Sequence, residues 1–516
     1  MAMTFGSFVE ASANKFPNRT ALIYEDRVVT YHELNERANR LANALLKRGV
    51  RKGDKVSLYL ENCVEYFETI FAVSKIGAVW IPIGFRLTAQ EMKYIVENSD
   101  SVALIFSDVL LGNVEEARKG LRKVSPDLII MVGGKVPRNV VDYNELLAGG
   151  EPQNPAILVN EEDDFYIAYT AGTTGAPKGA LFDHRARMTS ILLLSIEYGL
   201  HGADRHLCAG PLYHAAPWVF SFVHLFLGAQ VVLMRHFEPV GTLQLMQKYR
   251  ITTSFMVPTM YNMILNLPAE QRDAFDLSSV RVLISAASPL ATQTKEGIIK
   301  LFKQAGLHEF YGSTEIGVVS NLRPEDQLRK VRSVGPAMYL GEFRIFDENG
   351  QEVPQGKEGV IYMTGPTLLK EYYKNPDATR KAYRGRWFSN LDIGRLDEDG
   401  YLYIMDRKAD MIISGGVNIY PAEIEDLLIK HPKVLEAAVI GIPDEKWGES
   451  ILASIVPKDG MNVTIEEITA FCDGKIAKYK TPRFVQNVRE LPKSPAGKVL
   501  KRILREPYWK NSEAKV

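Results

Sequence analysis

Apolar residues in the first hundred positions follow two different spacings. Short apolar runs at 55–60, 78–83 and 102–106 predict strands, and residues 65–75 have the length and spacing of a helix. Because strands alternate with helices, the pattern predicts a largely parallel sheet with helices on its faces. Ligands of such sheets bind at the loops that follow the carboxyl ends of the strands.

Two four-residue segments mark helix starts. Thr30-Tyr-His-Glu33 and Thr88-Ala-Gln-Glu91 both have the spacing of a capping box, in which a threonine and a glutamate bond to each other's backbone N–H groups. The first is followed by apolar residues at helical spacing: Leu34, Ala38, Leu41 and Leu45. The second predicts a helix that ends before the strand at 102–106.

The pattern changes in the second half of the chain. Residues 341–365 combine short strands with turn signals and predict a small antiparallel sheet or barrel. After a shift in composition at 406–410, five short elements predict a separate α+β domain: strands at 411–414, 436–440 and 452–456, and helices at 421–430 and 465–471. We therefore expect a large domain of layered α/β sheets with a barrel-like part (1–405) and a small α+β domain (406–516).

Composition narrows the class of protein. A chain of 516 residues is too long for one core. Its 62 basic and 62 acidic residues balance, which removes the electrostatic argument for nucleic acid or an anionic membrane as the main partner. The three cysteines are far apart in sequence, so a disulfide framework or zinc site is not expected, and a reducing compartment is.

No segment has the pattern of a membrane anchor or a secretory leader. The most apolar run, 219–234, contains His224 and Gln230 and is shorter than a spanning helix requires, so it predicts buried core. The first residues lack a basic segment followed by an apolar one. A cytoplasmic protein is the expectation.

The segment with the clearest chemistry is 169–180, which follows the strand-like run 165–168. It holds three glycines, three threonines and Lys178. Backbone N–H groups exposed by glycine, hydroxyl donors and a lysine charge together suit a bound anion, and a nucleotide triphosphate is the expected one. An ordinary surface loop explains the same composition, since glycine and threonine are common turn residues.

With its downstream motifs, the chain resembles the adenylate-forming ligase superfamily, which includes acyl-CoA synthetases, aryl-CoA ligases, peptide-synthetase adenylation domains and luciferases. The resemblance covers essentially the whole chain. It rests on the order and spacing of six segments: Thr170–Lys178, Pro211–His214, Tyr311–Glu315, Asp392, Asp406-Arg407 and Lys498. It implies that ATP and CoA are reactants and that Mg²⁺ is a cofactor. It also implies a small, mobile C-terminal domain that rotates about a hinge at Asp406.

The resemblance also implies an ATP site. Its residues would be Thr170, Gly172, Thr173, Thr174, Gly175, Lys178, Ser288, Tyr311, Gly312, Asp392 and Arg407. Tyr311 would pack on adenine and Asp392 would accept hydrogen bonds from the ribose hydroxyls. The loop is not a Walker A motif, because proline precedes its lysine and glycine follows it.

Four residues are implied to act on the reacting groups. Thr314 would hold the α-phosphate, Glu315 would hold Mg²⁺ together with Thr170, and Lys498 would bridge the substrate carboxylate and the α-phosphate. His214 would lie beside the attacked carbonyl. Each has a simpler alternative: a capped helix start at 311–315, a solvated C-terminal lysine, and a structural histidine.

Two further sites follow from the same resemblance. An acyl pocket would be lined by Tyr213, Trp218, Ala286 and Ala287, although an aromatic residue in an apolar segment is more often core. The loop with Gly415, Gly416 and Asn418 would approach CoA in the second step, where glycine allows close backbone approach. A tight turn ahead of a helix at Pro421 is the alternative.

The expected reaction is formation of an acyl adenylate from an acid and ATP, followed by transfer of the acyl group to CoA. The acid is expected to be apolar, with a medium- or long-chain fatty acid first and aryl, alicyclic or bile-acid-type acids as alternatives. A non-catalytic nucleotide-binding protein is the alternative of another class. A homodimer is a possible assembly.

Three positions depart from the family's usual residues. Asn390-Leu391 replaces Thr-Gly before Asp392, which predicts an altered turn. Ser285-Ala-Ala-Ser-Pro replaces Ser-Gly-Gly-Ala-Pro, and the methyl groups of Ala286 and Ala287 predict a narrower pocket. Glu371 replaces glycine and is expected at the surface.

Overall fold

The computed structural model describes residues 2–170, 177–407, 410–414, 417–444, 446–493 and 499–509, without the side chains of Arg407 and Asn418. The chain divides into two compact units. The first contains Met1–Val331, Gly335–Glu342 and Thr364–Arg386, and the second contains Arg332–Val334, Phe343–Met363 and Trp387–Val516. The division into residues 1–405 and 406–516, with a hinge at Asp406, concerns movement and stays a prediction.

The first sheet of the first unit has the strand order β19-β9-β8-β4-β3-β5-β6-β7. Strands β8 to β7 along this order are parallel, and β9 and β19 are antiparallel to their neighbours. The predicted parallel sheet is confirmed. Its strands are β3 (Lys55–Tyr59), β4 (Val79–Pro82), β5 (Ser101–Ser107), β6 (Ile129–Val132), β7 (Val141–Asp142), β8 (Asp164–Thr170), β9 (Lys178–Asp183) and β19 (Glu371–Tyr372).

The second sheet has the order β14-β13-β12-β10-β11-β1-β2, and all neighbours are parallel except the β1–β2 pair. The carboxyl ends of β13 and β14 lead into residues 285–290 and 310–318, two of the segments singled out above. The strands are β1 (Thr20–Tyr24), β2 (Arg27–Thr30), β10 (Arg205–Cys208), β11 (Gln230–Leu233), β12 (Thr253–Phe255), β13 (Val282–Ser285) and β14 (Gly306–Glu309).

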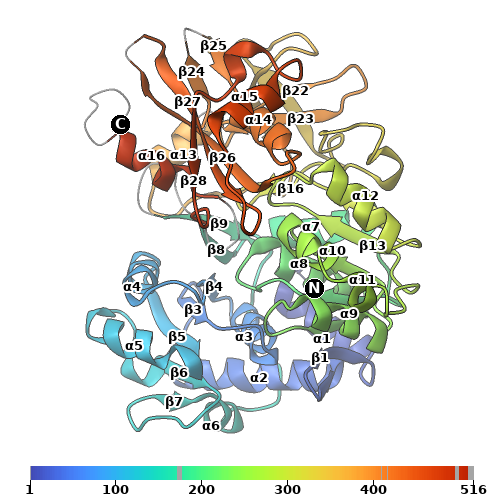
Figure 1. Cartoon of the computed structure of the whole chain (residues 1–516). Helices are drawn as coiled ribbons and strands as arrows, with labels where there is room; N and C mark the ends of the chain where they lie inside the picture. The colour runs from blue at the N-terminus through green and yellow to red at the C-terminus, as the bar shows by residue number, and fades with distance from the viewer. Residues whose placement is uncertain are drawn as a thin grey trace. The chain divides into compact units, whose positions relative to one another are not determined.

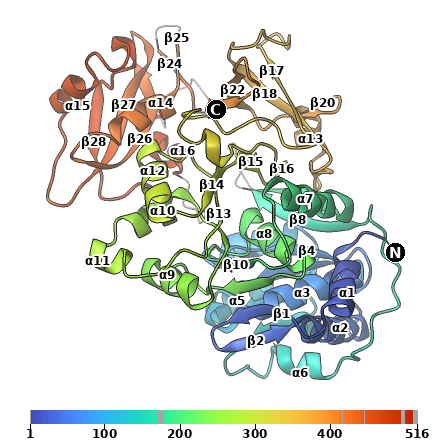
Figure 2. The same cartoon turned by 90° about the vertical axis from the view of Figure 1, so that its right-hand side faces the viewer.

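A layer of helices separates the two sheets. Helices α3 (Val64–Lys75) and α7 (His184–Glu197) contact strands of the first sheet, and α8 (Ala215–Phe226) contacts strands of the second. Helix α7 packs on α8 (Figure 2), and α1 (Phe5–Lys15) packs on both α3 and α8. This layer is rich in aromatic contacts; the rings of Phe5 and Phe165, for example, stack at 4.1 Å.

The remaining helices of this unit cover the outer faces and edges of the sheets. Helix α4 contacts β5, and α6 contacts β6 and β7, in the blue and cyan part of Figure 1; α12 contacts β14. Their bounds are α2 (Tyr31–Lys47), α4 (Ala89–Asn98), α5 (Leu111–Ala117), α6 (Tyr143–Ala148), α9 (Pro239–Lys248), α10 (Pro258–Leu265), α11 (Ala269–Arg272), α12 (Thr292–Leu301) and α13 (Pro376–Ala382).

The predicted helix starts agree with the structure. Thr88 and Glu91 form the expected reciprocal capping box of α4. At the start of α2 only one of the two expected bonds is present, in which the Thr30 hydroxyl accepts the Glu33 N–H at 3.1 Å. The apolar run 219–234 is divided between α8 and β11, both largely buried. Within the described ranges, no helix has both the length and the apolar character that a membrane span requires. The three cysteines are buried free thiols.

The second unit contains two sheets. One is antiparallel, with β18 paired to β17, β21 and β22, and β22 paired to β23. It corresponds to the small sheet predicted from 341–365. Its strands are β17 (Glu342–Phe346), β18 (Gly359–Thr364), β20 (Tyr383–Arg384), β21 (Trp387–Phe388), β22 (Asp392–Leu396) and β23 (Leu402–Arg407).

The other sheet of the second unit has the order β25-β24-β27-β26, with β28 parallel to β27. It confirms the predicted C-terminal α+β arrangement. The elements are β24 (Ile412–Ser414), β25 (Val417–Ile419), α14 (Pro421–Leu428), β26 (Val434–Asp444), β27 (Gly448–Pro457), α15 (Ile465–Cys472), β28 (Phe484–Asn487) and α16 (Lys501–Trp509).

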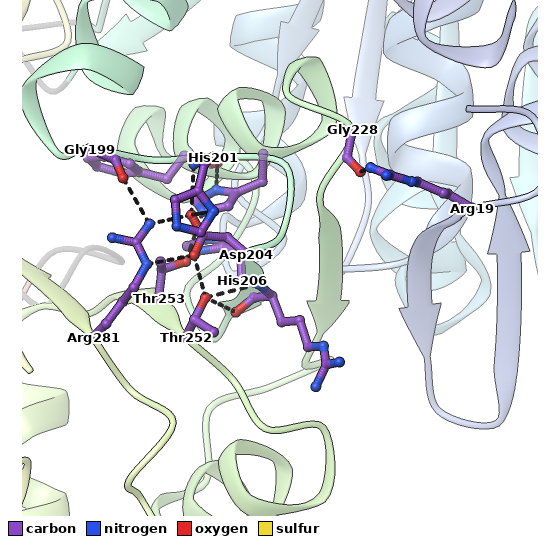
Figure 3. A network of polar contacts seen from close by, with 12 residues as sticks. Arg19, Gly199, His201, Asp204, His206, Gly228, Thr252, Thr253 and Arg281 are labelled. Atoms are coloured by element: carbon purple, nitrogen blue, oxygen red, sulfur yellow. Dashed lines mark hydrogen bonds and ion pairs between the residues drawn. The ribbon is translucent and has the colours of Figure 1, made fainter. Parts of the chain in front are cut away.

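A polar network closes the amino-terminal ends of three strands in the second sheet of the first unit (Figure 3). Asp204 accepts hydrogen bonds from Nε of Arg281 at 2.8 Å and from the Thr252 hydroxyl at 2.7 Å. His206, on β10, lies 3.1 Å from the Thr253 hydroxyl. The network lies at the opposite ends of the strands from segments 285–290 and 310–318.

Candidate active site

The predicted anion-binding loop connects two antiparallel strands. Strand β8 ends at Thr170 and β9 begins at Lys178, and these two residues face each other in the register. Both ends of the connection are held by tyrosines: Tyr169 donates to Oδ1 of Asn98 at 2.7 Å, and Tyr94 donates to the carbonyl of Pro177 at 3.2 Å. The predicted ATP-binding residues Gly172, Thr173, Thr174 and Gly175 lie outside the described residues.

Three hydroxyl groups converge on the carboxylate of Glu315. Oε1 accepts hydrogen bonds from Thr170 at 3.1 Å and from Tyr372 at 3.3 Å, and Oε2 accepts one from Ser313 at 2.8 Å. Lys178 is close by, with Nζ 5.6 Å from the centre of the Tyr372 ring. The structure thus brings together three predicted site residues, Thr170, Lys178 and Glu315, from separate parts of the chain.

Tyr372 and Ser313 are site residues that the sequence reasoning missed. Tyr372 is on β19, an added edge strand whose pairing with β9 places the phenol beside Glu315. Burial, followed by the nearby Glu315 charge, raises the pKa of Tyr372, so this phenol stays protonated as a donor. A strand of two residues has too little periodicity to be read from sequence.

Residues 312–318 form a β-hairpin. Strand β15 (Gly312–Ser313) pairs with β16 (Gly317–Val318), and Thr314 and Glu315 lie in the connecting turn. The alternative of a capped helix start at 311–315 is therefore wrong. Glycine is required at 312, because a β-carbon there would lie 2.2 Å from the Gly317 carbonyl oxygen. The half-buried Tyr311 precedes the hairpin, and its N–H donates to Oγ of Ser320 at 3.0 Å.

A buried arginine, Arg187, is linked to this hairpin through Thr367. The guanidinium of Arg187, on α7, lies 3.6 Å from the centre of the Phe182 ring and donates to the Thr367 carbonyl at 3.1 Å. The Thr367 hydroxyl in turn donates to the carbonyl of Ile316 at 2.9 Å. Burial lowers the pKa of Arg187 to about 10, which still leaves the group charged at neutral pH.

Segment 285–290 follows the carboxyl end of β13. Ala286 is buried, whereas Ala287 and Ser288 are exposed. Ala287 has φ +78°, a left-handed conformation that favours glycine. The expected departure from glycine thus has two consequences: a buried methyl group at Ala286, and strained backbone at Ala287.

Tyr213 and His214 lie together at the start of α8. Their rings are 4.2 Å apart, and the Tyr213 ring also contacts Phe85 edge to face at 5.4 Å. Burial raises the pKa of Tyr213 to about 12, so the phenol is neutral. His214 is the N-cap residue of α8 without a capping hydrogen bond from its side chain, and is partly exposed.

The structure places Trp218 in the core of the helix layer, and its place in an acyl channel stays a prediction. Its indole ring is fully buried and contacts Trp80 at 5.5 Å and Tyr166 at 5.4 Å. Phe220 and Phe222, on the same helix, are also fully buried. These side chains belong to the core of the helix layer, since α8 is apolar around most of its circumference.

Asp392 lies in the second unit at the start of β22 and is almost fully buried. Asn390 holds it twice: its Nδ2 donates to Oδ2 of Asp392 at 2.8 Å, and its Oδ1 accepts the Asp392 N–H at 3.4 Å. Leu391 between them has φ +65°. The altered turn predicted at Asn390-Leu391 is therefore a left-handed turn closed by the asparagine.

Of the other predicted residues of this unit, some are described by their backbone positions and some lie outside the described residues. Arg407 faces Asp392 in the β22–β23 register, and Oδ2 of Asp406 accepts the Ala422 N–H of α14 at 3.2 Å. Asn418 is on β25, which pairs with β24, so these segments form a strand pair ahead of Pro421. Gly415, Gly416 and Lys498 lie outside the described residues.

The oxygen groups around Glu315 fit a magnesium ion. A carboxylate and neighbouring hydroxyls are hard oxygen donors, and Mg²⁺ in nucleotide sites is held by one or two carboxylates together with phosphate oxygens. Carboxylate, hydroxyl and lysine groups at the ends of two sheets therefore suit a nucleotide triphosphate.

Comparison with known proteins agrees with this chemistry. Residues 9–373 match the family model described as AMP-binding enzyme, and residues 423–498 match the AMP-binding enzyme C-terminal domain. The chain is 35% identical to a feruloyl-CoA synthase of an Amycolatopsis species, over 98% of this chain and 99% of that one. It is 34% identical to the long-chain-fatty-acid–CoA ligase FadD13 of Mycobacterium tuberculosis, over 93% of each chain.

Among solved structures, the fold is similar to that of ATP-bound MatB from Rhodopseudomonas palustris. The TM-score is 0.89 at 30% identity, covering 99% of each chain.

Proposed function

Since the chain belongs to the AMP-binding enzyme family, we propose that this acid–thiol ligase activates an apolar carboxylic acid as its acyl adenylate and transfers the acyl group to CoA. Its reactants are the acid, ATP and CoA, with Mg²⁺ as cofactor. A medium- or long-chain fatty acid is the first candidate. The FadD13 relative, named for such acids, supports this choice.

An aryl acid is the second candidate. Phe85, Tyr213 and His214 present three neighbouring rings beside the position proposed for the attacked carbonyl, and aromatic rings favour an aryl ligand through edge and face contacts. The feruloyl-CoA synthase relative acts on an acid of this class by its name. Ala286 would narrow either pocket.

In the first step, a carboxylate oxygen attacks the α-phosphorus of ATP, and the bond to the bridging oxygen of pyrophosphate breaks. The main obstacle is the approach of two anions, so the residues act by neutralising and positioning charge. Bound Mg²⁺ supplies charge neutralisation, and Glu315 with Thr170 would hold it. Lys178 and the 170–178 loop hold the departing pyrophosphate.

The remaining contacts orient the nucleotide and the acid. Tyr311 lies against adenine, with Gly312 and Ser288 beside it, and Thr314 holds the α-phosphate. Asp392 and Arg407 hold the ribose. Lys498 bridges the acid carboxylate and the α-phosphate.

In the second step, the thiolate sulfur of CoA attacks the acyl carbonyl, and the bond from that carbon to the phosphate oxygen breaks, releasing AMP. His214 lies beside this carbonyl. Rotation of residues 406–516 about Asp406 withdraws Lys498 and brings Gly415, Gly416 and Asn418 to CoA. Replacing the Lys498 segment by residues 415–418 at the same active site lets that site perform both steps.

The observation that carries the proposal is the convergence of Thr170, Tyr372 and Ser313 on Glu315 next to Lys178. The test is CoA-dependent AMP release with straight-chain fatty acids of increasing length, aryl acids, dicarboxylic acids and amino acids. We expect fatty acids to give the highest kcat/KM. Activation of only dicarboxylic or amino acids would contradict the proposed substrate class.

A further inference from the structure

A buried ion pair lies between α12 and the end of β14. Nζ of Lys295 is 2.5 Å from Oε2 of Glu309, and the two side chains are 2% and 6% exposed. Both residues belong to the first unit. Neither was a candidate at the sequence level, where each is one charged residue within a mixed segment.

The carboxylate of Glu309 also holds the loop that follows β13. Its Oε1 accepts the Leu290 N–H at 3.1 Å, so one carboxylate joins α12 to segment 285–290. In the sheet, Glu309 is the register partner of Ser285, the first residue of that segment. The Phe310 N–H donates to the Ser285 carbonyl at 3.1 Å, directly before Tyr311.

These contacts connect two segments proposed to bind the nucleotide. Segment 285–290 contains the exposed Ala287 and Ser288, and its left-handed residue Ala287 has to be held in place by its surroundings. The chain from Glu309 leads through one residue to Tyr311. A shift of the Glu309 carboxylate would therefore move both sides of the proposed adenine pocket.

Energetics argue that this pair does more than stabilise the fold. Removing two charges from water costs several kcal/mol per ion, and well-packed apolar residues of similar volume are often equally stable or more so. A buried ion pair that adds no stability can still serve to hold the surrounding segments in a single conformation. Here Glu309 does so by bonding to Leu290 and Lys295 at the same time.

We infer that Glu309 and Lys295 are positioning residues for ATP, which hold segment 285–290 against the Tyr311 segment so that the adenine pocket has its working shape. This inference rests on the proposed ATP site. It goes beyond that site because neither residue touches the nucleotide in the proposed arrangement. The predicted effect is larger on ATP than on the acid, whose proposed pocket is lined by only one of the two segments.

The experiment measures ATP–pyrophosphate exchange with the acid that the substrate panel ranks first. Glu309→Ala is expected to raise the KM for ATP at least about tenfold, because small displacements of binding groups have large effects. The KM for the acid is expected to rise less than that for ATP, because Glu309 joins two segments proposed to bind the nucleotide, and only one of them, 285–290, also lines the proposed acyl pocket. Equal shifts in both KM values, or no shift, would overturn the inference.

Glu68 provides the matched control. It is fully buried on α3 and lies 2.5 Å from Nε of Arg37, far along the chain from the nucleotide segments. Glu68→Ala also removes a buried carboxylate from an ion pair, although its partner Arg37 is 21% exposed, and is expected to lower Tm. It should leave the KM for ATP unchanged. If Glu68→Ala raised the KM for ATP as much as Glu309→Ala, the effect would be one of stability only.

A charge-neutral double variant covers the case in which Glu309→Ala fails to fold. Lys295→Met with Glu309→Gln removes both charges but keeps an amide oxygen that can accept the Leu290 N–H. We expect its KM for ATP to lie between those of the wild type and Glu309→Ala, because the bond to Leu290 is retained while the ion pair with Lys295 is lost. A folded double variant with a strongly raised KM for ATP would contradict the inference.

Tyr311→Ala separates this inference from the proposed ATP site. If Tyr311→Ala raises the KM for ATP and Glu309→Ala does not, only the positioning role is wrong. If neither variant affects ATP, the proposed nucleotide site itself is wrong.

Discussion

The hydroxyl of Thr170 donates a hydrogen bond to Oε1 of Glu315 at 3.1 Å across a separation of 145 residues in sequence. The contact joins the end of β8 in one sheet to the hairpin that follows β14 in the other. Tyr372 reaches the same carboxylate oxygen from β19. The carboxylate is therefore held in place before any ligand binds, as a preorganised electrostatic site requires.

Replacing Glu315 by glutamine should strongly impair adenylate formation. The amide keeps the shape but loses the negative charge that would hold Mg²⁺, so we expect a decrease of about 10²-fold or more in ATP–pyrophosphate exchange. Tyr372→Phe removes one of three hydrogen bonds to the same group and should cost only about threefold to tenfold. Exchange rates at several Mg²⁺ concentrations test this, and equal activity of Glu315→Gln and wild type would contradict the proposed role.

Lys498→Ala should separate the two half-reactions. We expect adenylate formation to be almost abolished, because this cation is proposed to join the two reacting anions in that step only. Thioester formation from supplied acyl adenylate should be largely retained. Single-turnover measurement of each step decides the matter; equal loss in both steps would count against a role restricted to adenylation.

Glycine at position 391 should stabilise the second unit. Leu391 is 50% exposed with φ +65°, so its side chain contributes little packing, while its β-carbon strains the backbone. The left-handed conformation costs a residue other than glycine roughly 1–2 kcal/mol. Glycine removes this cost, but part of the gain is offset because glycine increases the conformational entropy of the unfolded chain. We expect Leu391→Gly to raise the free energy of unfolding by about 0.5–1 kcal/mol.

Leu391→Ala is the matched control for this prediction, because it removes the same side chain but keeps the β-carbon. Urea denaturation of both variants provides the measurement. If Leu391→Ala were as stable as Leu391→Gly, backbone strain would not be the cause.

Acid should destabilise the protein through its buried histidines. His224 is fully buried, its Nδ1 donates to the Phe220 carbonyl at 2.7 Å, and its Nε2 accepts from the Thr253 hydroxyl at 2.8 Å. Burial lowers the pKa of His224 to about 4 and that of the stacked His206 well below its ordinary value. Both side chains are therefore neutral in the folded protein.

The sign of the pH effect follows from these pKa values. Above the unfolded pKa of about 6.5 neither state binds the proton, and stability is complete. As the pH falls from about 6.5 toward the folded pKa, only the unfolded state gains protons, so the free energy of unfolding decreases. For His224 alone the loss is on the order of 3 kcal/mol near pH 4.

Urea midpoints across this pH range provide the test. His224→Gln retains hydrogen-bonding groups but has no proton to gain, so its stability should depend less on pH than that of the wild type. An identical slope for the two proteins would show that other groups control the acid response.

Local pattern accounts for much of what was predicted correctly. The strands β3, β4 and β5 and the helix starts at Thr30 and Thr88 follow from spacings within ten residues of one another, where the chain's own periodicity determines which face is apolar. The C-terminal α+β unit follows for the same reason. The alternative interpretation of 311–315 as a helix start is wrong because Gly312 closely approaches Gly317 in a hairpin, a contact that a capping signal does not describe.

The sequence by itself determined the order of helices and strands, the family, and the residue types available for nucleotide chemistry, since these depend on short-range pattern and motif spacing. Only the tertiary structure placed Trp218 in the core, Tyr372 on Glu315, and Lys295 on Glu309. Those contacts join segments through sheet register and helix packing. The packing energy of such contacts depends on several segments that are distant in sequence, so no local sequence pattern reveals it. Only the folded structure decides which of these side chains meet.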